Sequence, residues 1–345
     1  QFLSGFGTFQ HNNFSIKRFF ISFVNALKKL RTTIRWVIWT IAGLYLTAIV
    51  LLHIPVVQDF LAQKVGNLAG DKLGTEVHVG RIDLGFINRF VLDDILIYDQ
   101  SHKKMLSASR IGARVDIWHL LRTGEINISS AQIFGLQAEL YKTSKDAKPN
   151  FQFALDSLAS KDTTSHTPLH LSINSLVVRH GSIKYDCMDA PTTPNRLNLN
   201  HINLTNISSY IILHKLNDTS VWANLRSLAF KEASGLEVKQ LAFDLNANQK
   251  QANLRNFVYE GTNSKITLKA LLTTYKFNDK KLDINTLRYD LQSLKAQVKP
   301  SDFVPLLPEL RTITTNYTAA IDAKGTNQSV VVKQLNISDP SLSTH

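Results

Sequence analysis

The side chains able to support hydrolytic chemistry are a few carboxylates. Asp93 and Asp94 are adjacent, and Asp186 is followed closely by Asp189. Paired carboxylates act as general acid and base when their surroundings separate their pKa values. Both pairs lie at the ends of strand-like stretches, where solvated turn residues are the ordinary interpretation. A hydrolase acting on glycan or peptide is a hypothesis that rests on these residues and on the compartment predicted below.

Metal and nucleophile chemistry has less support. The eleven histidines are scattered, and the pair His166 and His170 flanks Pro168 in a polar stretch, where the i, i+4 geometry of a helix is implausible. The one cysteine, Cys187, excludes an internal disulfide and a multi-cysteine metal site. It alternates with Ile183 and Tyr185, which is typical of a small residue packed on a strand. No nucleophile elbow, phosphate loop or dinucleotide motif is present, so we expect neither an enzyme nor a cofactor.

The strongest pattern is an uncharged apolar run from Trp36 to Leu52. Its length corresponds to roughly 26 Å of helix, so residues 34–54 can cross a bilayer core of about 30 Å. Six cations and no acidic residue precede the run, which predicts a cytoplasmic N-terminus and the bulk of the chain outside the cytoplasm. We expect a single pass through the membrane, with the anchor residues Trp36, Trp39, Tyr45 and Leu52.

A cleaved signal peptide is the alternative interpretation of the same run. Signal peptides have an apolar region of about 7–15 residues and a small-x-small cleavage site. This run is longer and ends without an Ala-x-Ala sequence, which favours an uncleaved anchor.

The net charge of +12 suggests a nucleic-acid partner only at first sight. Half of it precedes the apolar run, and the rest is spread over some 290 residues without a basic stripe or interleaved aromatics. The footprint of a phosphate-binding surface is therefore missing, and we expect no nucleic-acid partner.

Helical periodicity is confined to the N-terminal part of the chain. Residues 1–33 predict a cytoplasmic basic amphipathic segment, either lying on an anionic membrane surface or simply feeding the span. Pro55 can begin a second amphipathic helix over 55–74. A third, short helix is predicted around Phe151–Leu158, inside a polar linker or mobile loop at 142–168.

From Glu76 the apolar period changes from 3.6 to 2, which predicts β-strands. We expect a mainly β protein: an elongated, curled antiparallel sheet over 75–141 that continues over 169–345. Degenerate units such as Val238–Leu245 and Leu282–Leu291 each change the phase of their alternation, as a β-bulge in a curving sheet requires. The chain begins without Met and stops soon after a strand-like stretch, so we expect it to be the N-terminal part of a longer protein, truncated at its C-terminus.

These residues resemble a known family. The single span followed by His53–Gln58, Leu73–Ile82 and Phe90–Asp99 resembles the opening of the AsmA-like family, and within it the TamB-type inner-membrane subunits of the translocation and assembly module, in particular their Bacteroidota-type members. Ser301–Pro308 resembles the helix that interrupts the sheet in that family.

The resemblance implies a taco-like β-groove, apolar inside, that conducts phospholipid across the periplasm and supports outer-membrane protein assembly. It also implies an outer-membrane β-barrel partner of the TamA or BamA type, met through a C-terminal region that this sequence lacks. A periplasmic scaffold that carries no lipid is the alternative.

A sheet with alternate apolar side chains on one face supplies a lipid-compatible lining without specific binding residues. Any of these positions can equally be ordinary core under a covering helix. The candidate lining residues are Phe134, Leu136, Leu140, Ile183, Tyr185, Leu197, Leu199, Phe243, Leu245, Ile266, Leu268, Leu282 and Ile284.

Overall fold

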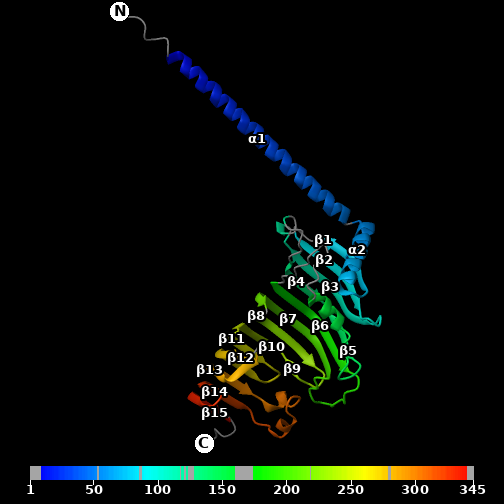
Figure 1. Ribbon diagram of the computed structural model, residues 1–345, viewed down its shortest axis with the longest axis vertical. Helices are drawn as coiled ribbons and strands as arrows, with labels where there is room; N and C mark the ends of the chain where they lie inside the picture. The colour runs from blue at the N-terminus through cyan, green and yellow to red at the C-terminus, as the bar shows by residue number, and fades with distance from the viewer. Residues whose placement is uncertain are drawn as a thin grey trace, which may run out of the picture. The chain divides into compact units, whose positions relative to one another are not determined.

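The computed structural model describes residues 9–52, 54–84, 88–116, 118–119, 122, 128–159, 174–217, 219–278 and 281–339. The chain divides into two compact units, residues 1–58 and residues 59–345. The first unit is helical and the second is mainly β (Figure 1).

The first unit is dominated by α1, Phe9–Leu52, a single helix of 44 residues. Within its described residues, the segments expected at 1–33 and 34–54 form one continuous helix, because no glycine or proline interrupts the sequence between Phe9 and Gly43. Residues 1–8 and 53 lie outside the described residues. Its part from Lys28 to Leu51 is long and apolar enough to cross a membrane, as an anchor or a signal sequence would. The Thr40 and Thr47 hydroxyls donate to carbonyls four residues earlier, at 2.9 Å each, so these polar groups are satisfied within the helix.

The second helix, α2, runs from Pro55 to Leu73, as predicted. It ends at Gly74, whose φ of +71° suits glycine, and the Gly74 and Thr75 amides donate to the carbonyl of Gly70. Ala62 packs with Val79 and Ile82 of the first strand in a small buried cluster. A Cβ at Gly66 would lie 2.8 Å from the Val77 carbonyl oxygen, so glycine allows α2 to approach this edge strand closely.

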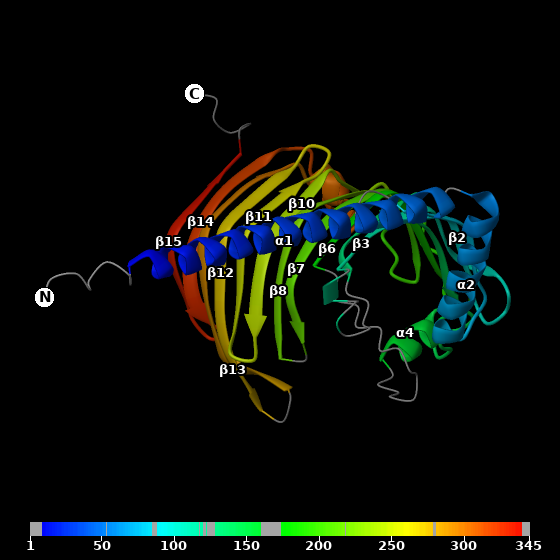
Figure 2. The same ribbon diagram turned by 90° about the horizontal axis from the view of Figure 1, so that it is seen from above.

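One sheet of 15 strands makes up most of the second unit, with the order β1-β2-β3-β4-β6-β7-β8-β10-β11-β12-β13-β14-β15, while β5 pairs with β3 and β6 and β9 pairs with β8. Figure 1 shows the strands stacked in chain order, and Figure 2 shows that they bend, so the sheet is curled. The strands are β1 Val77–Leu84, β2 Arg89–Tyr98, β3 Lys104–Val115, β4 Ile128–Phe134, β5 Gln137–Lys142, β6 Ser175–Cys187, β7 His201–Asn217, β8 Ser220–Glu232, β9 Glu237–Val238, β10 Gln240–Asn248, β11 Gln251–Glu260, β12 Lys265–Asn278, β13 Lys281–Val298, β14 Tyr317–Thr326 and β15 Val330–Ser338.

The predicted mainly β fold with an N-terminal apolar helix is confirmed, and the sheet is mostly antiparallel, although two of its strand pairs are parallel. The β4–β6 and β5–β6 pairs are parallel, and the other pairs are antiparallel. Parallel neighbours need a crossover connection, and the chain between Lys142 and Ser175 provides it. Periodicity within strands does not reveal this, because pairing direction depends on the path of the connection.

The first part of the predicted linker at 142–168 is tied to the sheet. Asn150 closes this segment on β5: its side chain accepts from the Tyr141 amide at 3.0 Å, and its amide donates to the Tyr141 carbonyl at 2.8 Å. The short helix α4, Gln152–Ala159, follows, close to the helix predicted there. The remainder of the predicted linker, from residue 160, lies outside the described residues.

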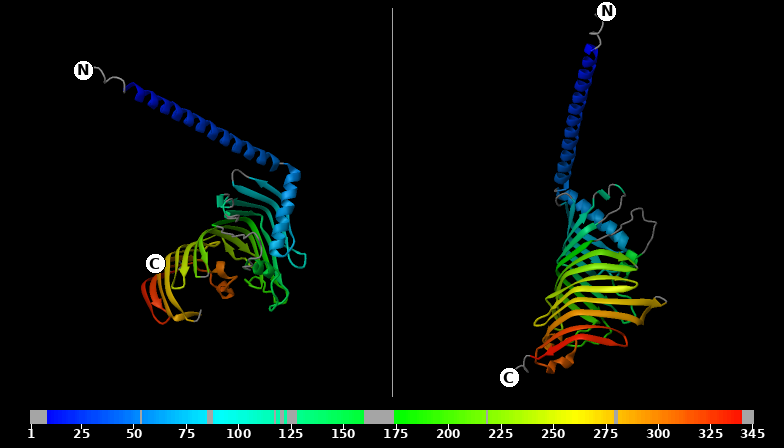
Figure 3. Two further views of the ribbon diagram at one scale, coloured as in Figure 1. Left: turned by 45° about the horizontal axis from the view of Figure 1, so that its top comes forward. Right: turned by 90° about the vertical axis from the view of Figure 1, so that its left-hand side faces the viewer.

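Two short 3-10 helices, η1 Pro300–Phe303 and η2 Pro308–Thr312, interrupt the sheet between β13 and β14. The family resemblance of Ser301–Pro308 implied one helix here; the structure has two short 3-10 helices separated by residues 304–307. In Figure 3 (left) they lie, in orange, within the curl of the sheet. Phe303 contacts the ring of Tyr259, with the ring centroids 5.8 Å apart.

A line of irregular residues crosses the middle of the strands, and we call it the crease. Asp94, His180, Asn206, Asn256 and Ser293 have φ between 51° and 55° within β2, β6, β7, β11 and β13. The register places Asn256 and Ser293 on the two sides of Lys269 in β12. Where an L-residue takes this left-handed conformation the alternation of side chains shifts by one position, so each strand keeps its apolar residues on one face through the bend. β2 is an example: Leu92 and Ile95 lie three residues apart on the two sides of Asp94, and they pair with Ile82 and Val79 of the buried cluster.

Candidate functional site

The crease divides each long strand into two segments. The segments on one side of the crease form limb A, together with the short strands β5 and β9. The segments on the other side form limb B, together with β4 and most of β10. In an antiparallel or parallel pair, residues directly opposite each other project from the same face. The pairing register therefore assigns each side chain to one of two faces.

One face is apolar in both limbs, and we call it the apolar face. In limb A a row runs Phe257, Leu268, Leu294, Ile321 and Leu335 across β11 to β15. In limb B a row across β7 to β15 consists of Leu213, Ala223, Leu245, Leu254, Leu271, Leu291, Ala323 and Val332. A continuous stripe of aliphatic side chains thus runs perpendicular to the strands.

Short helical elements contact parts of this face. Leu61, Ala62 and Val65 of α2 pack on β1 and β2 at one end, and Phe303 of η1 contacts Tyr259 of β11. Between these contacts the leucines of the limb B row are half-buried, and at β15 Val332 and Leu335 are 49% and 54% exposed. The face therefore retains apolar surface that the described chain leaves accessible.

Most of the predicted lining residues share the apolar face. Leu136 precedes β5 in the phase of Ala138, which pairs with Ile183. The residues on the apolar face by register or phase are Leu136, Leu140, Ile183, Tyr185, Phe243, Leu245, Ile266 and Leu268. Leu268 is only 7% exposed and so is core rather than surface.

Five predicted lining residues are placed elsewhere. Phe134 is in register with Arg110 and Arg179 on the opposite face, and its ring lies 5.9 Å from the Arg179 guanidinium carbon. Leu197 and Leu199 lie in the loop before β7, not in a strand, because Asn198 forms a turn with Asn200 and His201. Leu282 and Ile284 are at the tip of the β12–β13 hairpin, 45% and 60% exposed.

Leu254, Leu271, Leu294 and Leu335 also belong to the apolar face but were not among the predicted lining residues. Each belongs to a strand in which apolar and polar residues alternate on both sides of the crease. For Leu254 and Leu294 the available signal is a short polar residue, Asn256 or Ser293, between two alternating stretches of different phase. Among the described residues of β12 and β15 no non-glycine residue has a positive φ, so Leu271 and Leu335 lack this signal.

The opposite face is polar, and a charged cluster lies on it beside the crease. Asp93 of β2 bridges its two neighbouring strands: it accepts from Arg110 of β3 at 2.6 Å and from Arg81 of β1 at 3.0 Å. The Asp93 side chain is 11% exposed. The hydrogen bond from Arg110 is the main cause that holds the pKa of Asp93 below its ordinary value, against the opposing effect of burial.

The carboxylates considered as catalytic candidates are separated. Asp93 is bound in the ion pairs just described, and its neighbour Asp94 is exposed at the crease. Asp186 accepts from His201, whose other ring nitrogen lies 2.9 Å from the Ala190 carbonyl oxygen. Asp189 accepts from the Cys187 thiol at 3.1 Å, and burial is the main cause that raises the pKa of that thiol. His166 and His170 lie outside the described residues, and within the described part no three metal-binding side chains converge.

Comparison with known proteins adds no assignment, since no family model, no curated protein and no solved structure matches the chain. The structure alone defines the class. It is a mainly β protein in which an N-terminal apolar helix precedes a long, mostly antiparallel 15-stranded sheet with few helices.

Proposed function

We propose that the protein is held in the inner membrane by α1 and uses the apolar face of its curled sheet as a groove that shields and conducts phospholipid toward the outer membrane. The observation that carries this proposal is the unbroken aliphatic row from Leu213 to Val332, whose leucines are half-buried and whose last member, Val332, is exposed. The resemblance of residues 53–99 to the AsmA-like family points the same way.

The physical argument concerns the acyl chains. Each methylene group transferred from water to an apolar surface gains about 0.8 kcal/mol, so a lipid crossing an aqueous compartment needs apolar contact at every step. Side chains in the row repeat at the strand spacing of about 4.8 Å. Neighbouring positions then offer nearly equal surroundings, and an acyl chain can move along them without crossing a deep minimum. No catalytic group is required.

Anchoring fits the same role. The exposed Trp36 and Trp39, 68% and 69% accessible, belong to a helix that is long and apolar enough to cross a membrane. In a bilayer these side chains would be surrounded by lipid. An anchor of this kind would keep the sheet beside a source of phospholipid. Support of outer-membrane protein assembly, with a β-barrel partner, would follow from supplying lipid at the site of insertion.

Leu271 and Leu272 provide a matched test. They are adjacent leucines of β12, both half-buried, but Leu271 pairs with Leu254 and Leu291 on the apolar face, while Leu272 pairs with Asn253 and Asp290 on the polar face. We expect a photo-crosslinking residue at position 271 to give phospholipid adducts in cells, and the same residue at 272 to give none. Mass spectrometry of the purified protein detects the adducts.

Transfer of a fluorescent phospholipid between vesicles is the functional readout. Leu271→Asp should slow transfer strongly, and Leu272→Asp should leave it unchanged. Equal adducts at both positions, or none at either, would refute the lipid proposal. A protein that still supported outer-membrane assembly with either aspartate, without binding lipid, would be the non-transporting scaffold.

A further inference from the structure

The polar face of limb B carries a second row of side chains with different chemistry. In register with one another are Lys215 of β7, Trp222 of β8, Asn246 of β10 and Asn253 of β11. Their neighbours along the strands project from the apolar face. An aromatic ring, a cation and two carboxamides therefore lie side by side on four adjacent strands, about 4.8 Å apart.

Two cavities open on either side of this row. The larger, of about 640 Å³, is formed where the β7–β8 and β10–β11 hairpins end and is lined by Lys215, Trp222, Asn246, Asn248 and Lys250, among others. The smaller, of about 400 Å³, includes Asn224, Asp244 and Arg255. Trp222 and Asn246 line both cavities, so the indole and the carboxamide stand where the two cavities meet. The linings also include Val221 in the larger cavity and Leu245 in the smaller one.

Trp222 is held in place while much of its ring stays accessible. The imidazole of His214 stacks on the indole, with ring centroids 4.4 Å apart and an angle of 27° between the planes. Trp222 is nevertheless 48% exposed. Exposing a large aromatic side chain to water costs free energy. His214 holds the Trp222 ring in one orientation but does not cover it.

A layer of hydrogen bonds supports the row. His214 interacts through Nε2 with the Oδ1 of Asn224 at 2.5 Å, and the Nδ2 of Asn224 donates to Asp244. Asn256, at the crease, donates to the other Asp244 oxygen at 2.7 Å, which is the main cause that lowers the Asp244 pKa. Asn224 is only 8% exposed. These hydrogen bonds hold the residues beneath Trp222 in place, and they do not involve the side-chain amides of Asn246 and Asn253.

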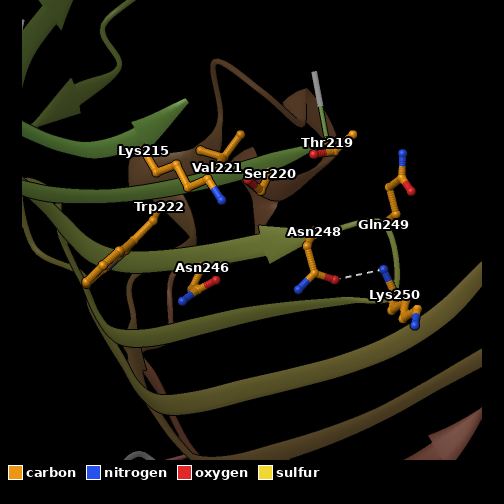
Figure 4. A pocket seen from close by; sticks show the side chains of 9 residues that line it. All are labelled: Lys215, Thr219, Ser220, Val221, Trp222, Asn246, Asn248, Gln249 and Lys250. Carbon is orange, nitrogen blue, oxygen red and sulfur yellow. Dashed lines mark hydrogen bonds between the residues drawn. The ribbon is translucent and has the colours of Figure 1, made fainter. Parts of the chain in front are cut away.

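The amides around the larger cavity are oriented toward it. Figure 4 shows Lys215 and Trp222 projecting from neighbouring strands in different directions, with Asn246 and Asn248 on the strand next to that of Trp222. The Asn248 Oδ1 accepts from the Lys250 and Gln251 amides, which fixes the side chain and leaves its Nδ2 on the side of Asn246. Among the described residues lining this cavity there are two lysines and no carboxylate.

We propose that this surface, the Trp222 row, binds a saccharide that carries carboxylate or phosphate groups. The C–H face of a pyranose ring stacks on an indole, and carboxamides offer both donors and acceptors to its hydroxyls. Lys215 and Lys250 supply the charge that pairs with an acidic substituent. The strand spacing is similar to the length of one sugar unit, so successive units can meet successive strands. This function is separate from that of the apolar face, because the row lies on the other face of the sheet.

Binding is measured on the full chain in detergent, with an alginate hexasaccharide as the acidic probe and maltohexaose as the neutral one. We expect binding of the acidic probe to quench tryptophan fluorescence and to weaken with salt. Trp222→Ala should lower affinity about tenfold, Trp222→Phe should retain most of it, and Lys215→Gln should weaken the acidic probe alone. Trp118→Ala, which removes an indole that is 76% exposed elsewhere, is the matched control and should change nothing.

A second arm asks where the acidic sugar comes from. Phosphatidylcholine vesicles that carry a ganglioside present the sugar as a lipid headgroup, and plain phosphatidylcholine vesicles control for the membrane. Trp222-dependent binding of either the free or the lipid-linked acidic sugar supports the proposal and identifies the source. Equal affinity of the Trp222→Ala variant and the parent for both probes overturns it, provided circular dichroism shows the variant folded. Equal binding of the neutral probe overturns the acidic assignment.

Discussion

At the residue scale, Asp93 shows how a carboxylate that resembles an acid–base candidate is used for structure. It accepts from arginines of both neighbouring strands next to the crease, where the backbone ladder is irregular. The two ion pairs link β2 to both β1 and β3 at this position. The sequence predicts Asp93 and Asp94 to be solvated turn residues, but only Asp94 is exposed, while Asp93 is buried between the two arginines.

Asp93→Asn should lower the free energy of unfolding by about 1–3 kcal/mol at neutral pH, because it removes the charge that two arginines share. The pKa of Asp93 is lowered by folding. Its contribution is therefore complete above the unfolded value of about 3.9 and is lost as the pH falls through the lower folded value.

Denaturant unfolding of parent and variant at pH 7 and at pH 3 measures this. The difference between them should shrink at the lower pH. Asp94→Asn is the control, since Asp94 is the exposed neighbour and Asn tolerates the same left-handed backbone. A difference that stays constant with pH would mean that the ion pairs contribute nothing.

At the scale of the elements, the crease decides how a strand of up to 18 residues keeps one face apolar while it bends. The residues with positive φ inside strands are Asn, Asp, His and Ser, which are short polar or ring side chains, and none is β-branched. β-Branched residues, which favour regular strands, are disfavoured in the left-handed region. The composition of the crease therefore follows from its backbone.

Ser293 provides the test, with φ of 51° in the middle of β13 and its amide donating to Asp322 of β14. Ser293→Gly should leave stability unchanged or slightly raised, and Ser293→Val should cost about 1–2 kcal/mol. Thermal unfolding by circular dichroism gives the comparison. Ser208→Val, an exposed serine in β7 without positive φ, should be tolerated. If valine cost the same at both positions, the crease would not be a backbone requirement.

At the scale of the whole molecule, α1 and the sheet are suited to different surroundings. The helix exposes tryptophans and leucines all along its apolar part, while the sheet has one polar face with many charged side chains. The two are compatible if the helix is in a bilayer and the sheet in water.

We expect the protein to stay with membranes after an alkaline carbonate wash, and the sheet to be cleaved by a protease added from the periplasmic side. Mass spectrometry of the N-terminus distinguishes the anchor from a signal peptide, which would be removed near residue 52. A soluble mature protein that begins after α1 would contradict the anchor and leave the sheet properties unaffected.

The sequence by itself determined the apolar helix, the helix from Pro55, the change to period 2 near Glu76 and the phase changes within strands. These are local properties, because periodicity and the breaking of helices at proline depend on neighbouring residues. Clearly alternating residues such as Leu140, Ile183 and Tyr185 share one face of the sheet in the structure, as their alternation predicts.

The tertiary structure alone decided the parallel pairing of β6, the turn that removes Leu197 and Leu199 from the sheet, and the position of Phe134 beside two arginines. Pairing direction and register depend on connections and on contacts distant in sequence, and a one-residue shift moves a side chain to the other face. The alignment of the irregular residues into one crease, and of Lys215, Trp222, Asn246 and Asn253 into one row, arises only when the strands are side by side.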